Sequence, residues 1–269
     1  MHFKAALLSA VLASTASSAA LPLVPRQNPA TGEIMHTIIF GSENGAPITP
    51  EYVNATDNVW KKVQLGIPLK VFGVVSDYIW ISTNGVVSIE EPSADCQNVP
   101  SGPLPVNPAA YKDGSGTGCL PKNTLMPFWN DLALRPGTMD THVKLILAWH
   151  PDEEGHISTW YHYHLEWQLC EKGVAEGVVS DRMPCGDASR TVYMTWGIGS
   201  EPDMIGFDFY FPKAGGFSNT GTIGVQSYPN SVTLPLSELK GEQDGEVVVV
   251  YFDTKKFTYE FKGSFIRPW

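Results

Sequence analysis

The sequence predicts an all-β protein, an antiparallel β-sandwich stapled by two disulfides. Short segments rich in Val, Ile, Thr and aromatic residues recur along the 269 residues, and these residue types favour strands. The chain has 25 glycines and 21 prolines, which supply the turns between the segments. Charged residues make up only 17%, against about 25% in ordinary globular proteins, which argues against a coiled coil and against charge-driven disorder.

The predicted strands are bounded by Gly, Pro, Asn or Asp, which end extended segments. No repeat, charge run or linker interrupts residues 33–262, so we predict a single sandwich domain over residues 33–269. Only residues 235–240 indicate a helical turn. We expect strands over residues 33–40, 61–64, 70–74, 77–83, 86–90, 142–149, 156–168, 191–197, 205–211, 221–227, 246–252 and 257–262.

The dipeptide Asn84-Gly85 gives the sharpest local prediction. It separates two runs rich in β-branched residues and is typical of a two-residue type I′ hairpin, with positive φ at both positions. In that register Thr83 pairs with Val86, and Ile81 shares a face with Val86. Apolar residues lie on both faces, so we expect a structural hairpin that is covered on both sides.

The first 20 residues are typical of a secretory signal peptide. Lys4 precedes an apolar run, and Ser18 and Ala20 stand at the two positions that signal cleavage requires. Residues 21–32 are predicted to be an extended leader. No later segment is long and apolar enough to span a bilayer, so we expect a secreted protein, extracellular or bound to a cell wall, with no integral membrane segment.

Four cysteines in a secreted chain imply disulfides, and four cysteines allow three connectivities. Their order along the chain favours Cys96–Cys119 and Cys170–Cys185, each closing one polar loop. Close Cys-x-x-Cys spacing, which a zinc site needs, is absent. The one N-glycosylation sequence, Asn-Ala-Thr, begins at Asn54, which we expect on an exposed loop.

Four short blocks along the chain carry a family resemblance. They are Phe-Gly at 72–73, Ile-Ser-Thr-Asn-Gly-Val-Val-Ser at 81–88, Pro-Phe-Trp-Asn-Asp at 127–131 and Thr-Gly-Thr-Ile-Gly-Val-Gln at 220–226. In this order, within residues 70–228, they resemble the signature blocks of NIDO-type (nidogen-like) extracellular β-domains. The resemblance implies a non-catalytic adhesion or matrix module, with no catalytic residues to transfer. Residues 91–123 and 170–185 depart from the family pattern and look like added loops.

The segment around His162, His164 and Glu166 carries the strongest chemical signal. On a strand these three side chains point to one face, and two His at i and i+2 can converge on one metal with Glu166 as an oxygen ligand. The alternative is a solvated or glycan-facing polar side of a strand. We expect the second, and therefore no bound metal.

Glu166 and Asp208 are the residues that catalysis would use. Asp208 lies between Phe207 and Phe209, so it projects opposite the two rings and onto the same face as Glu166. A pair of carboxylates in a Trp-lined sheet is what a β-sandwich glycosidase needs. The eight Trp residues are scattered, which favours core positions, although several on one exposed face would form a platform for sugar rings.

The net charge of -10 argues against nucleic acid as a partner, because phosphate binding requires clustered Lys and Arg. No cofactor is expected, since the chain has neither a phosphate-cradling glycine loop nor a dinucleotide fingerprint. We predict a secreted, non-catalytic binding module for an extracellular carbohydrate or cell-surface partner. A secreted glycan hydrolase and a host-directed effector or elicitor are the two alternatives.

Overall fold

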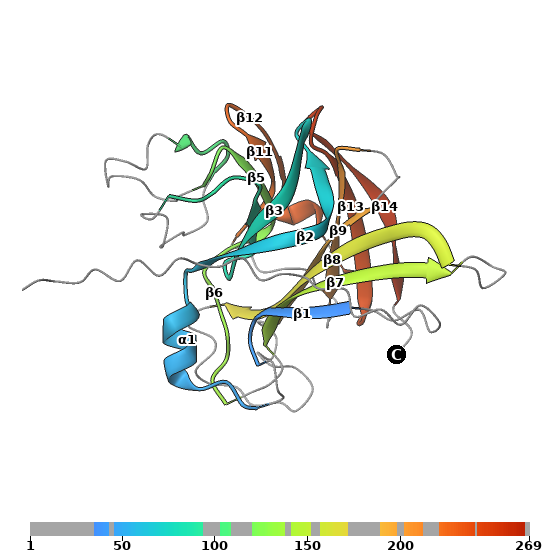
Figure 1. Cartoon of the computed structure of the whole chain (residues 1–269). Coiled ribbons are helices and arrows are strands. Elements are labelled where there is room, and N and C mark those ends of the chain that lie inside the picture. The colour runs from blue at the N-terminus through green and yellow to red at the C-terminus, as the bar shows by residue number, and fades with distance from the viewer. Residues whose placement is uncertain are drawn as a thin grey trace, which may run out of the picture.

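The computed structural model describes residues 35–42, 46–93, 103–108, 120–137, 141–151, 157–171, 189–197, 202–211, 221–239 and 241–266. The fold is all-β, as predicted, with two antiparallel sheets (Figure 1). The predicted signal peptide and leader lie outside the described residues.

The larger sheet has eight strands and contains the residues singled out for metal binding and catalysis. Strand β14 forms one edge of this sheet. The short strand β6 pairs with β8 and lies outside the consecutive order of the other seven strands. In spatial order the strands are β1 (Met35–Phe40), β7 (His142–Pro151), β8 (Ile157–Glu171), β9 (Ser189–Gly197), β10 (Met204–Phe211), β13 (Glu246–Asp253) and β14 (Thr258–Ile266), with β6 at Leu132–Ala133.

The smaller sheet has six strands, in the order β12 (Asn230–Leu234), β11 (Thr222–Ser227), β5 (Asn123–Trp129), β4 (Val86–Ser88), β3 (Val74–Ser82) and β2 (Trp60–Val71). A 3-10 turn, η3 (Leu236–Glu238), follows β12 where the sequence indicates a helical turn. Strand β2 joins the predicted strand 61–64 to the first two residues of the predicted strand 70–74, and its register is irregular between Gln64 and Leu69. The rest of that predicted strand is the turn at residues 72–73 and the start of β3 at Val74.

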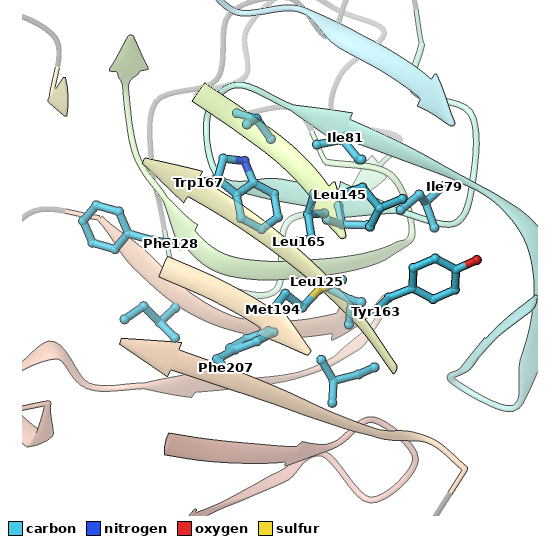
Figure 2. Packing of buried hydrophobic residues seen from close by; sticks show 14 of the residues in the cluster. Ile79, Ile81, Leu125, Phe128, Leu145, Tyr163, Leu165, Trp167, Met194 and Phe207 are labelled. Atoms are coloured by element: carbon cyan, nitrogen blue, oxygen red, sulfur yellow. The ribbon is translucent and has the colours of Figure 1, made fainter. Parts of the chain in front are cut away.

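One apolar cluster fills the space between the two sheets (Figure 2). Ile79, Ile81 and Leu125 come from the smaller sheet, and Leu165 and Phe207 come from the larger. Such interdigitation from two inner faces is the basis of a β-sandwich. A hydrogen bond also joins the two sheets, because the buried indole N–H of Trp167 donates to the carbonyl of Ser82 at 2.9 Å.

A second apolar cluster lies on the outer face of the smaller sheet. Its buried members are Val86, Leu120, Met126 and Trp129, and Trp60, Leu104 and Val106 pack against them. The fully buried Gln226 side chain fixes the covering segment 103–108: its Oε1 accepts from the amide of Val106 at 2.7 Å, and its Nε2 donates to the carbonyl of Val106 at 2.9 Å. Strand β4, part of the hairpin at Asn84-Gly85, is therefore covered on both sides, as predicted for that hairpin.

The hairpin at Asn84-Gly85 differs from the prediction by one residue. Ser82, rather than Thr83, pairs with Val86, so the loop has three residues and only Gly85 has a positive φ, of 70°. This is the arrangement in which a turn is followed by a glycine in the left-handed region.

The shift in register reverses the predicted faces. Ile81 pairs with Val87, which lies in the core between the sheets, whereas Val86 belongs to the outer cluster. The cause is the buried Asn84 side chain, which needs the extra loop residue to reach its partners. Its Oδ1 accepts from the amide of Leu132 at 3.1 Å, and its Nδ2 donates to Asn58 Oδ1 at 2.7 Å.

The β2–β3 turn is held against the larger sheet. The amide of Phe72 donates to Thr254 Oγ1 at 3.0 Å, and the amide of Gly73 donates to Asp203 Oδ1 at 2.7 Å. The Thr254 hydroxyl also donates to the carbonyl of Asp203 at 2.9 Å, and the rings of Phe72 and Phe257 stack with centroids 6.3 Å apart. We call these contacts the turn junction.

A short helix, α1 (Pro50–Thr56), is absent from the prediction and lies at one end of the molecule (Figure 1). Thr49 caps it by accepting from the amide of Tyr52 at 3.2 Å. Asn54 is exposed, as expected, but it lies in this helix and not in a loop. Among the described residues no helix is long and apolar enough to cross a membrane.

The predicted disulfide pairings stay predictions. Cys170 is fully buried near the end of β8, and no cysteine in the described part of the chain is free. Cys96, Cys119 and Cys185 lie outside the described residues.

Candidate binding surfaces

Glu166 lies on the outer face of the larger sheet, where β7 and β8 pair. Val143 and Leu145 of β7 face the core, so the alternate residues His142 and Lys144 face outward beside it. Lys144 Nζ lies 2.7 Å from Glu166 Oε2, and His142 Nε2 lies 3.3 Å from Glu166 Oε1. We call these three side chains the carboxylate network.

The network keeps Glu166 ionised although its side chain is buried. Burial by itself raises the pKa of a carboxyl group, but the hydrogen bond with His142 and the charge of Lys144 outweigh that effect and hold the pKa of Glu166 below its usual value. A general acid needs the opposite shift, because it must carry a proton near neutral pH. Glu166 is therefore unsuited to protonate a glycosidic oxygen.

Asp208 lies on the same face as Glu166, as the sequence indicates. Both residues pair with position 193 of β9, one from each side, so two strand spacings, about 10 Å, separate their Cα atoms. Retaining glycosidases hold their carboxyl groups about 5 Å apart, and inverting glycosidases hold them about 6.5–9.5 Å apart. The shared face is compatible with the wider spacing, but the paired, ionised state of Glu166 argues against Glu166 as the acid of such a pair.

The proposed metal ligands do not form a free ligand set. Both Glu166 oxygens are engaged by cationic or imidazole groups, and Lys144 holds the positive charge that a metal would bring. Within the described ranges, no group of three or more His, Cys, Asp and Glu side chains could hold a metal ion. His164 is half-buried on β8, and the side chain of His162 lies outside the described part.

A second surface, which was not predicted from the sequence, lies on the outer face of β2 and β3. Ile79 and Ile81 face the core, so Tyr78 and Trp80 point outward, and both are half-buried. Trp60 extends this row and packs against the outer cluster. We call Trp60, Tyr78 and Trp80 the aromatic strip.

Lys62 lies within the aromatic strip. It pairs with Trp80 across the two strands, and its Nζ lies 4.4 Å from the centroid of the Tyr78 ring and 5.0 Å from that of the Trp80 ring. Exposed Gln64 pairs with Tyr78 on the same face. The surface thus combines flat rings with an ammonium and an amide, groups that stack on and hydrogen-bond to polar ligands.

A sequence signal for the aromatic strip does exist. In β2, Trp60 and Lys62 lie on one face and the buried Val63 lies on the other. In β3, Tyr78 and Trp80 lie on one face and the buried Ile79 and Ile81 lie on the other, so each strand has one apolar and one mixed face. Pairing the two strands in register brings the mixed faces together. The other Trp side chains that the structure describes, Trp129 and Trp167, are fully buried, as expected for core positions.

The blocks that carry the family resemblance are structural. Residues 81–88, 127–131 and 222–226 lie on the neighbouring strands β3, β4, β5 and β11, and residues 72–73 form the turn junction. None of them contributes a side chain to the carboxylate network. Comparisons with protein-family models, curated proteins and solved structures give no match for this chain.

Proposed function

We propose that this protein is a secreted, non-catalytic binding module that recognises an extracellular glycan through the aromatic strip. The observation that carries the proposal is the outward row of Trp60, Tyr78 and Trp80 on β2 and β3. The CH faces of sugar rings stack on flat aromatic side chains, and half-buried rings lose little conformational entropy when they bind.

We further propose that the module is secreted, disulfide-bonded and glycosylated. The signal sequence directs the chain to an oxidising compartment, where Cys96–Cys119 and Cys170–Cys185 form and Asn54 is glycosylated. The NIDO-like blocks support an adhesion role outside the cell or at the wall. Non-reducing peptide mapping of the secreted protein tests the pairing, and recovery of a Cys119–Cys170 peptide would contradict it.

The test of the function is a binding panel of soluble neutral and acidic polysaccharides, measured by affinity electrophoresis. We expect at least one polysaccharide to bind wild-type protein, and Trp80→Ala or Tyr78→Ala to weaken that binding at least tenfold. Tyr251→Ala is the matched control, because Tyr251 is an exposed ring on the opposite sheet with Lys262 Nζ 5.7 Å from its centroid. Equal binding by wild type and Trp80→Ala would contradict the proposal.

A further inference from the structure

Lys62 differs from the other half-buried lysines that the structure describes. Lys144 pairs with Glu166, and Lys61 Nζ donates to the carbonyl of Ile39 at 2.8 Å. Lys62 has no carboxylate or carbonyl partner in the described residues, and its ammonium contacts only the rings of Tyr78 and Trp80. Its three N–H donors therefore remain available to a ligand.

The position of this ammonium decides what the aromatic strip can bind. It lies over the two rings, where a stacking sugar has to lie. A neutral sugar displaces the ammonium and gives it no charged partner in return. A sugar with a carboxylate offers the ammonium a charge-assisted hydrogen bond as its ring takes over the aromatic faces.

We propose that the aromatic strip selects acidic glycans, with the sugar ring on Tyr78 and Trp80 and the sugar carboxylate on Lys62. This inference rests on the proposed glycan-binding function and deepens it. The protein's net charge of -10 opposes long polyanions at a distance, but interactions between exposed charges are largely screened beyond about 8 Å at physiological salt. Short uronic acid oligomers are therefore the appropriate ligands.

The experiment compares each acidic trimer with its uncharged methyl ester. Trimers of galacturonate, mannuronate and glucuronate are prepared as free acids and as methyl esters, and their binding is measured by calorimetry. We expect wild-type protein to bind at least one free acid tenfold or more tightly than its ester. Lys62→Met should bind that acid and its ester equally, whereas Lys62→Arg, which keeps the charge, should retain the preference.

The outcomes separate the inference from the function on which it rests. Wild-type protein that binds every ester as tightly as its acid, or a preference that survives Lys62→Met, overturns the acidic selectivity and leaves glycan binding intact. A loss of neutral glycan binding in Trp80→Ala would then still support the function. Absence of binding to all the trimers and to the whole polysaccharide panel overturns both. Thermal melts of both Lys62 variants check that they are folded.

Discussion

At Gly85 a left-handed backbone conformation coincides with close packing. Its φ of 70° is one that L side chains rarely adopt, and a Cβ built on it would lie 2.0 Å from the carbonyl oxygen of Phe128. Gly73 has nearly the same φ, 71°, but its Cβ would meet nothing within 4 Å. The two glycines therefore separate the cost of a left-handed conformation from the cost of a steric clash.

We expect Gly73→Ala to lower the free energy of unfolding by about 1 kcal/mol, the cost of the left-handed conformation alone. Gly85→Ala should lower it by roughly 3 kcal/mol or more, because β4 and β5 must also move apart. Chemical denaturation measures both values. Equal losses in the two variants would show that the close approach to Phe128 contributes nothing.

Glu166 links the stability of the protein to pH. Its pKa is lowered in the folded state, so its ionised form contributes stability above the unfolded value near 4.5, and this contribution is lost as the pH falls through the lower folded value. Replacing it with Gln leaves the ammonium of Lys144, whose side chain is 22% exposed, without its carboxylate.

Glu166→Gln should therefore destabilise the protein by roughly 2 kcal/mol at pH 7, and the difference from wild type should shrink below about pH 4. Glu260→Gln is the control, because the Lys262–Glu260 pair is exposed and should contribute less than about 1 kcal/mol. Unfolding curves at several pH values supply the comparison. A difference between wild type and Glu166→Gln that stays constant from pH 7 to pH 3 would refute the proposed linkage.

At the scale of elements, the alternating patterns of β8 and β10 could be predicted from the sequence, and the uniformly buried strand β5 could not. The alternation in β8 and β10 placed Glu166 and Asp208 on one face, as the structure confirms. In contrast β5 is buried along its whole length and contains Pro127, so neither alternation nor propensity marked it as a strand. The Thr-Pro-Glu sequence at 49–51 does indicate a helix start, and this signal could have revealed α1.

The contacts within the candidate sites could not be predicted from the sequence either. No sequence signal indicates that Lys144 and His142 pair with Glu166, because that contact depends on which strands are neighbours. The predicted register of the hairpin was wrong for a related reason, because the hydrogen-bond partners of Asn84 are the distant residues Asn58 and Leu132. Local rules describe the turn itself, whereas long-range hydrogen bonds decide its length.

Besides its apolar packing on the outer cluster, the segment 103–108 is held by hydrogen bonds to one side chain of β11, that of Gln226. Gln226→Met should remove both hydrogen bonds to Val106 and lower stability by about 2 kcal/mol. Gln64→Met, on the exposed part of the same sheet, is the control and should change it by less than about 0.5 kcal/mol. Hydrogen exchange shows where the effect falls: faster exchange at Val106 supports the argument, and unchanged exchange there contradicts it.

At the scale of the whole molecule, hydrogen bonds join the sheets in addition to apolar packing. They include the bond from Trp167 to Ser82, the bond from Lys61 to the carbonyl of Ile39 and those of the turn junction. In the junction the fully buried Thr254 hydroxyl both accepts and donates, so it connects β2 and β3 to the β10 and β13 side of the larger sheet.

Thr254→Val keeps the shape of this side chain but leaves the amide of Phe72 without its acceptor. We expect it to lower the free energy of unfolding by about 2 kcal/mol, because an unsatisfied amide is costly. Thr258→Val, on the exposed strand β14, should change it by less than about 0.5 kcal/mol. Comparable denaturation midpoints for the two variants would show that the turn junction does not stabilise the packing of the two sheets.

The edge strand β14 bears on how the protein behaves when it is concentrated. Phe261, Phe265 and Ile266 are exposed there, and an apolar open edge is a template on which a further chain can polymerise. Its ladder with β13 is irregular between Val249 and Val250, opposite a Gly263 with φ of 131°. The bulge divides the edge into two short runs, so a fibril seeded there would lose continuous backbone pairing after about four residues.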